Sequence, residues 1–266
     1  MNLHDKLTGL RALWYFDNRW QLIVNRLLFG DCGLMIYQKG NLEFLVDHDA
    51  GDHNGTRLCI ISDIYKRFLP DMKLGGMLTV FDLGANGGGF PLMLLLSGKR
   101  FSKLVCVEMN PNTFRRLQYN VSRNVEGETV LINGAVCRSR TKFELALGQG
   151  DISDSIYQDR AEASSKPRQK YQIEGYSFDD LFRAHFGDGV VDICKMDIEG
   201  AEYEVLASSE HTGLQNCRYL IIELHPVPAD RERQFADALR ATGFVELNGG
   251  DQRLPGERLY RNEKLT

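Results

Sequence analysis

From Thr79 onwards, short apolar runs typical of strands alternate with segments that have a helical period. Strands that are separated by helices pair in parallel, because the crossover returns the chain to the same end of the sheet. Both faces of a parallel sheet are covered by helices. The sequence therefore predicts an α/β fold with a mostly parallel sheet and helices on both faces. Its strand-like runs are residues 79–83, 104–108, 129–135, 190–197 and 219–224, with a final pair at 244–247 and 258–261.

The predicted helices have clear start and stop signals. Residues 90–96 are apolar on all sides, which predicts a helix deep in the core. Asn110-Pro111 supplies an N-cap residue and a proline at the first helical position. Further signals are a capping box at Ser177-Phe-Asp-Asp180 and a last helix over residues 230–241 that ends at Gly243.

Residues 1–70 are predicted to form a cap on a main domain of residues 71–266. In order, the cap contains a helix over residues 20–28, a hairpin of strands 33–37 and 42–46, and a helix over residues 60–69 that Pro70 ends.

Composition limits the class of protein. The chain has 266 residues and a formal net charge of −4, which disfavours nucleic acid as a partner because phosphate binding needs a basic surface. The apolar runs are far shorter than the roughly 20 residues of a membrane span, and the first twenty residues lack a signal-peptide pattern. Six well-separated cysteines without a Cys-x-x-Cys motif are typical of reduced thiols. We expect a cytoplasmic protein.

A polar segment at residues 149–170 interrupts the strand and helix alternation. Compact domains seldom contain a free loop of this length unless it is a lid or binds a ligand. Asp151, Ser153 and Ser155 are its candidate contact residues. The alternative is an ordinary solvated loop.

A glycine-rich turn follows the first strand-like run of the main domain. Asp82-Leu-Gly84-Ala-Asn86-Gly-Gly88 leads into the next predicted helix, whose N-terminus offers free N–H groups to a ligand. A dinucleotide fingerprint would need glycine at position 86, where asparagine stands. Glu108 ends the next strand-like run, where a carboxylate can accept hydrogen bonds from ribose hydroxyls. The pattern fits either another nucleoside cofactor or NAD.

Candidate catalytic residues end two later strand-like runs. Asp197 and Glu199 follow Lys195, and His225 ends the run after it, so all three should lie at the carboxyl edge of the sheet. We predict that Asp197, Glu199 and His225 form the catalytic cluster. Alternatively, the two carboxylates only stabilise a helix N-terminus and the backbone satisfies the histidine. A third possibility is a magnesium or manganese site that includes Glu223 or His225.

Three motifs together resemble the FkbM family of S-adenosylmethionine-dependent methyltransferases. They are Asp-x-Gly-Ala-Asn-x-Gly at residues 82–88, Glu-Met-Asn-Pro at 108–111 and Lys-x-Asp-x-Glu-Gly-x-Glu at 195–202. The resemblance covers roughly residues 60–225. It departs at Gly87, where the family usually has an apolar residue, and at Met109, where it usually has proline.

The resemblance implies a class I methyltransferase-like, Rossmann-like fold and S-adenosylmethionine as the cofactor. It implies an O-methyltransferase that acts on a hydroxyl of a sugar, glycan or glycosylated natural product. Transfer to a hydroxyl needs a base for its proton, and we expect this base to be His225, with Asp197 or Glu199 orienting it or acting instead. The implied cofactor-binding residues are Asp82, Gly84, Ala85, Asn86, Gly88, Glu108 and Met109.

Two other classes of function compete with methyl transfer. An NAD-dependent oxidoreductase would also explain the glycine turn, but its Tyr-x-x-x-Lys motif occurs only as Tyr260 to Lys264 in the tail. A non-catalytic nucleoside-binding domain would be expected to lack the Asp197 cluster, which is intact here.

Overall fold

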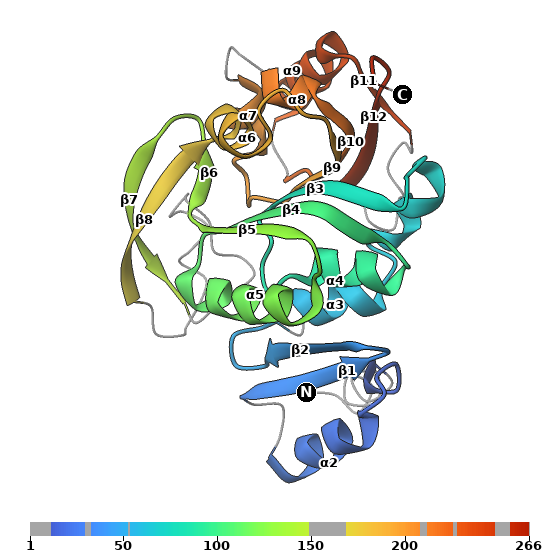
Figure 1. Cartoon of the computed structure of the whole chain (residues 1–266). Coiled ribbons are helices and arrows are strands. Elements are labelled where there is room, and N and C mark those ends of the chain that lie inside the picture. Colours follow the sequence, from blue (N-terminus) through green and yellow to red (C-terminus); the bar gives the residue numbers. More distant parts are fainter. Residues whose placement is uncertain are drawn as a thin grey trace.

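A seven-stranded sheet forms the centre of the computed structural model, which describes residues 12–29, 33–52, 54–148, 169–207, 212–225, 228–247 and 256–265 (Figure 1). The strand order is β11-β12-β10-β9-β3-β4-β5, and β10, β9, β3, β4 and β5 run parallel. Strand β12 is antiparallel to both of its neighbours. The bounds are β3 (Met77–Leu83), β4 (Arg100–Glu108), β5 (Glu128–Asn133), β9 (Val191–Met196), β10 (Cys217–Glu223), β11 (Phe244–Glu246) and β12 (Glu257–Asn262). The predicted α/β class and mostly parallel sheet are confirmed.

Helices cover both faces of this sheet (Figure 1). On one face lie α4 (Gly89–Leu96) and α5 (Pro111–Asn124), and on the other lie α6 (Phe178–Phe186), α7 (Glu202–Ala207), α8 (Thr212–Gln215) and α9 (Ala229–Thr242). Alternate residues of β3 divide between two apolar clusters, with Val80 in one and Phe81 in the other. The predicted helix ends are also confirmed, because the side chains of Asn110 and Ser177 cap α5 and α6, and Gly243 ends α9 with φ 107°.

A second, three-stranded sheet has the order β6-β8-β7 and contains β6 (Ala135–Cys137), β7 (Thr141–Leu147) and β8 (Gln169–Ser177). The prediction of one strand over 129–135 is wrong at its end, because the chain leaves the central sheet at Gly134. A side chain there would collide with Tyr176 of β8. The predicted polar segment is also too long, since Gln169 and Lys170 begin β8. Its remainder, including Asp151, Ser153 and Ser155, lies outside the described residues.

The N-terminal part contains α2 (Arg19–Phe29) and the predicted hairpin, formed by β1 (Leu34–Lys39) and β2 (Leu42–Asp47). The apolar side chains of Trp20, Leu27 and Leu28 on α2 are exposed, and Leu22 is its buried residue.

The predicted helix over residues 60–69 is wrong. The chain forms α3 (Thr56–Ile61) and then a short 3-10 helix, η1 (Lys66–Asp71). Ser62 has an extended backbone that ends α3, and Pro70 lies inside η1. Buried Ile60 and Phe68 belong to the same apolar cluster as α4 and β3. The division at residue 70 stays a prediction, and in the structure both parts share a core.

Two asparagines of α5 hold the hairpin through its β2 edge. The Asn120 side chain accepts from the Leu45 N–H at 2.6 Å and donates to the Leu45 carbonyl at 3.0 Å. Asn124 does the same with Glu43, at 2.9 and 2.7 Å. Asn120 also donates to the carbonyl of Gly87 at 2.7 Å. The amide groups thus pair with the edge of β2 as a neighbouring strand would.

Candidate active site

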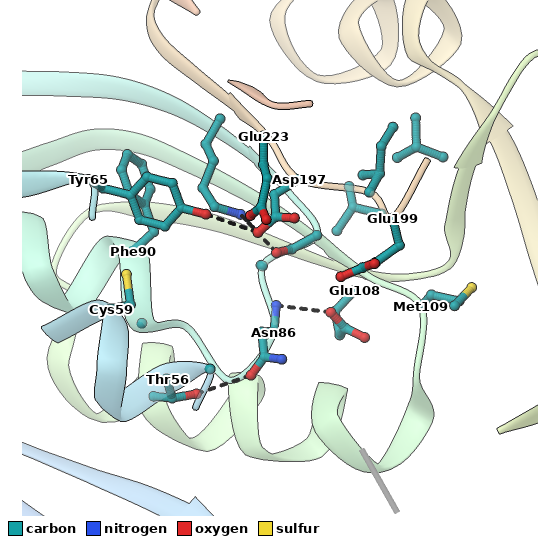
Figure 2. Close-up of a pocket in the computed structure, with 18 of the residues that line it drawn as sticks. Thr56, Cys59, Tyr65, Asn86, Phe90, Glu108, Met109, Asp197, Glu199 and Glu223 are labelled. Carbon is teal, nitrogen blue, oxygen red and sulfur yellow. Dashed lines mark hydrogen bonds and ion pairs between the residues drawn. The ribbon is translucent and has the colours of Figure 1, made fainter. Parts of the chain in front are cut away.

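A cavity of about 320 Å³ opens at the carboxyl ends of β3, β4, β9 and β10 (Figure 2). Open α/β sheets bind their ligands at this edge. The turn after β3 forms its floor, and Glu108 and Met109 lie on one side. Asp197 and Glu223 lie on another, and Thr56 and Tyr65 close the cavity from the N-terminal part. The lining residues therefore come from both parts of the chain.

The glycine-rich turn is held in shape by close packing and by its own asparagine. Gly84 has φ 74°, and a side chain there would collide with the backbone carbonyl of Asp197. Asn86 has φ 49°, a left-handed conformation that asparagine tolerates, and its side chain accepts from the Gly87 N–H at 2.6 Å. A side chain on Gly87 would collide with the hydroxyl of Thr56. The glycine at this position, where the resembled family usually has an apolar residue, is therefore required by the packing of α3.

Glu108 ends β4 with both carboxylate oxygens oriented by backbone groups. Oε2 accepts from the Asn86 N–H at 2.9 Å (Figure 2). Oε1 accepts from the Asn110 N–H at 2.7 Å. A carboxylate oxygen has two lone pairs and can accept hydrogen bonds from more than one donor. The fixed carboxylate beside the apolar side chain of Met109 fits a nucleoside with two ribose hydroxyls.

Five of the seven predicted cofactor-binding residues line the cavity, namely Gly84, Ala85, Asn86, Glu108 and Met109. Asp82 and Gly88 do not. Asp82 is fully buried below the turn, where its Oδ1 lies 3.3 Å from the Lys195 Nζ. Gly88 has φ 85°, precedes α4 and packs against Leu117 of α5. The structure thus places these two residues outside the cavity lining, where they support the glycine-rich turn on the side away from the cavity.

Lys195 connects Asp82 to the acidic side of the cavity. Its Nζ donates to the carbonyl of Gly84 at 3.0 Å and lies 3.5 Å from Asp197 Oδ2. The Tyr65 hydroxyl donates to the same oxygen at 2.9 Å (Figure 2). Burial alone would lower the pKa of Lys195, but the charges of Asp82 and Asp197 raise it above its usual range. Lys195 is therefore a permanent cation beneath the glycine turn.

The predicted catalytic cluster is divided in two. Glu199 and His225 come together, with 3.1 Å between Oε2 and Nε2, whereas the contacts of Asp197 are Tyr65 and Lys195. The other ring nitrogen of His225, Nδ1, lies 3.2 Å from Oε1 of the buried Glu202. These two carboxylates raise the pKa of His225 to about 10 despite its partial burial. At neutral pH the ring is therefore an imidazolium, which cannot accept a proton.

Glu202 fixes the loop that follows β9. Its Oε1 accepts from the Ile198 N–H at 3.0 Å and the Gly200 N–H at 3.2 Å. Glu199 between them has φ 54°, a conformation that costs a residue with a side chain about 1–2 kcal/mol. His225 bridges Glu199 and Glu202, so its evident role is to hold this loop.

A pH-dependent loss of stability should follow from this bridge. A histidine whose pKa is raised in the folded state stabilises the protein fully below the pKa of the unfolded chain, near 6.5, and this contribution is lost as pH rises through about 10. We expect His225→Gln to lower the free energy of unfolding most at pH 6 and least at pH 10. Urea titrations at both pH values measure the difference. A loss in the free energy of unfolding that is the same at both pH values would contradict the ion pair. The matched control is His185→Gln, which replaces a histidine outside this cluster.

Several lining residues were not predicted. Thr56, Cys59 and Tyr65 come from the N-terminal part, and Glu223 was considered only as a metal ligand. Within the described ranges, no group of three or more histidine, cysteine or acidic side chains is placed to hold a metal ion. No helix of the described chain is long and apolar enough to cross a membrane.

The strand order with an antiparallel β12 and the cavity at the carboxyl edge of the parallel strands are those of a class I methyltransferase-like domain. A family model described as the methyltransferase FkbM domain matches residues 82–247, which is more than half of the chain. This chain belongs to the FkbM family of methyltransferases, which confirms the resemblance seen in its motifs. Its cofactor is accordingly S-adenosylmethionine.

Two solved structures are similar to this chain. The crystal structure of methyltransferase FkbM from Methylobacillus flagellatus KT is 17% identical, with a TM-score of 0.50, and the match covers 75% of this chain and 47% of that one. This chain thus spans less than half the length of that structure. A putative transferase from Pyrococcus horikoshii is 14% identical, with a TM-score of 0.45 and coverage of 88% and 72%. The search of curated proteins found no match.

Proposed function

We propose that this chain is an O-methyltransferase that transfers a methyl group from S-adenosylmethionine to a hydroxyl of a sugar, glycan or glycosylated natural product. The observation that supports it is that one cavity is lined by the oriented carboxylate of Glu108 on one side and by Asp197 and Glu223 on another. When bound, the cofactor supplies a methyl group on a positively charged sulfur. The carboxylates of Asp197 and Glu223 in the same cavity are hydrogen-bond acceptors that suit a hydroxyl-rich acceptor molecule.

The chain's own residues would bind and orient the two substrates. Glu108 would accept hydrogen bonds from the ribose, and Met109 would supply apolar contact beside it. The backbone of Gly84 to Asn86 would approach the cofactor closely, supported from behind by Lys195. Alignment supplies much of the rate of a displacement reaction, and such alignment requires a rigid turn.

Asp197 would orient the acceptor in this proposal. Its Oδ2 is already held by Tyr65 and faces Lys195, so the carboxylate has a fixed direction and a compensated charge. His225 would act through Glu199 as a positioning residue, because its ring carries a proton at neutral pH. We place the reaction in the cytoplasm, since five described cysteines are buried free thiols.

Methyl transfer from tritiated S-adenosylmethionine tests the proposal. Three acceptor sets are compared, namely a mixture of methyl glycosides, total transfer RNA and free amino acids. We expect label in the glycosides, at an ether that resists base treatment. Label in RNA or in amino groups alone would contradict O-methylation of a sugar. Asp197→Asn should reduce the labelling at least about tenfold, while S-adenosylhomocysteine still binds.

A further inference from the structure

Glu223 is a cavity-lining carboxyl group at the carboxyl end of β10, and its surroundings are unusual (Figure 2). Within the described part of the chain, no residue donates a hydrogen bond to its side chain. A half-buried acid without a donor is costly, because its charged form loses hydration and gains nothing in return. Such a group in a substrate cavity is suited to a partner that arrives with the substrate.

The charged groups around Glu223 come from four neighbouring elements. Two are acids, Asp197 after β9 and Glu257 opposite Glu223 on β12. The cations nearby already pair with other carboxylates. Lys195 faces Asp82 and Asp197. Arg67 of η1 lies 3.7 Å from Glu257, and His225 lies between Glu199 and Glu202. The remaining titratable neighbour is Tyr65, whose pKa is raised far above its usual value by burial and by Asp197, so it stays a neutral donor.

We propose that Glu223 is the proton acceptor for the hydroxyl that is methylated, an inference that rests on the proposed O-methyltransferase function. A C–O bond forms between the acceptor oxygen and the methyl carbon, while the S–C bond breaks and its electron pair stays on sulfur. The hydroxyl proton passes to the Glu223 carboxylate, which becomes the neutral acid. The acceptor hydroxyl is thus the hydrogen-bond donor that Glu223 lacks.

The strength of this base supports the assignment. Burial, together with the charges of Asp197 and Glu257, raises the pKa of Glu223 to about 8. A proton acceptor with a pKa near the working pH takes up the proton readily and releases it afterwards. Asp197 is less suited, because its carboxylate already accepts a hydrogen bond from Tyr65 and lies beside the Lys195 cation. His225 is already protonated.

The decisive variant is Glu223→Gln, which keeps the shape of the side chain and removes the base. We expect its affinity for S-adenosylhomocysteine, measured by calorimetry, to stay within about threefold of wild type. We expect kcat for methylation of the methyl glycoside mixture to fall by about 100- to 10,000-fold. Glu126→Gln, an exposed glutamate at the far end of the sheet, is the matched control and should retain full activity.

Two results would overturn the assignment. One is a large loss of S-adenosylhomocysteine affinity in Glu223→Gln with an unchanged kcat, which would mean that Glu223 binds the cofactor's ammonium group. The other is a pH dependence of kcat in Glu223→Gln that is the same as in the wild type. Wild-type kcat should rise with pH through about 8, because the carboxylate is the active form, and the residual activity of Glu223→Gln should lack this rise.

A titration separates failure of this inference from failure of the proposed function. In the full chain labelled with carbon-13 at glutamate carboxyl groups, one signal should titrate near 8 and be missing from Glu223→Gln. S-Adenosylmethionine, with its positive sulfur, should lower that value more than S-adenosylhomocysteine does. If no glycoside is methylated but this titration is seen, the acceptor class is wrong and the base assignment stands. If Glu223 titrates near the ordinary value of about 4.3, the base assignment is wrong whatever the acceptor is.

Discussion

Glu108→Ala is expected to weaken the binding of S-adenosylhomocysteine by about 100-fold or more. Hydrogen bonds from two ribose hydroxyls to a carboxylate are worth about 1.5–3 kcal/mol, which is roughly tenfold to over a hundredfold in affinity. The structure adds a second loss, because the same carboxylate accepts from the N–H groups of Asn86 and Asn110. Without it, both backbone groups lose their acceptor at the cavity and the glycine turn is less rigid. The effect should therefore reach the upper end of the range.

Calorimetry at constant pH measures this affinity, and Glu144→Ala is the control because Glu144 is exposed and pairs with Lys170 on the second sheet. Glu108→Gln should lie between wild type and Glu108→Ala, since the amide keeps one acceptor oxygen. Unchanged affinity in Glu108→Ala, with an intact fold by circular dichroism, would show that the ribose does not contact this residue.

Lys195→Met is expected to lower the free energy of unfolding by about 3–5 kcal/mol. The substitution leaves Asp82, which is fully buried, without its counter-charge. It also removes the donor to the Gly84 carbonyl, so the cavity floor should be affected as well. Urea denaturation measures the loss, and a large part of it should be absent when Asp82→Asn is added, because an amide carries no charge to bury.

Lys103→Met provides the matched control for this substitution. Lys103 pairs with Glu128 at 2.7 Å, a shorter distance than that to Asp82, but Glu128 is exposed to solvent. An exposed pair contributes less than about 1 kcal/mol. Equal losses for the two lysines would show that burial of Asp82 does not decide the cost. The same conclusion would follow if the variant with both Lys195→Met and Asp82→Asn lost as much stability as the two single variants added together.

Much of the fold could be predicted because its signals are local. The turn after β3, the N-cap at Asn110 and the glycine that ends α9 each depend on a few neighbouring residues. The position of Glu108 beside the turn follows from the parallel pairing of consecutive strands. These features were predicted correctly, whereas the single strand over 129–135 was not. The chain changes sheets at Gly134, where a side chain would collide with Tyr176, more than forty positions away, so no neighbouring residue signals the change.

The chemistry of the site was harder to predict, because it depends on which charges meet. His225 was expected to be a base, and only the structure shows that Glu202, the first residue of α7, reaches its second nitrogen. The contact between Tyr65 and Asp197 joins residues far apart in the sequence, so no spacing rule finds it. Glu223 could have been found. It stands two positions before His225 at the same strand end, and residues two positions apart in a strand lie on the same face.

The position of Asn120 makes the hairpin and the cofactor turn thermodynamically linked. Its side-chain amide forms hydrogen bonds both with the backbone of Leu45 at the edge of β2 and with the carbonyl of Gly87. Any fluctuation that separates the hairpin from α5 therefore removes a support of the turn, and any ligand that orders the turn raises the cost of that fluctuation. The N-terminal hairpin, which lies away from the cavity, thereby becomes part of what determines cofactor affinity. Sequence changes in the hairpin could tune how tightly the domain holds its methyl donor without altering a single residue that touches it.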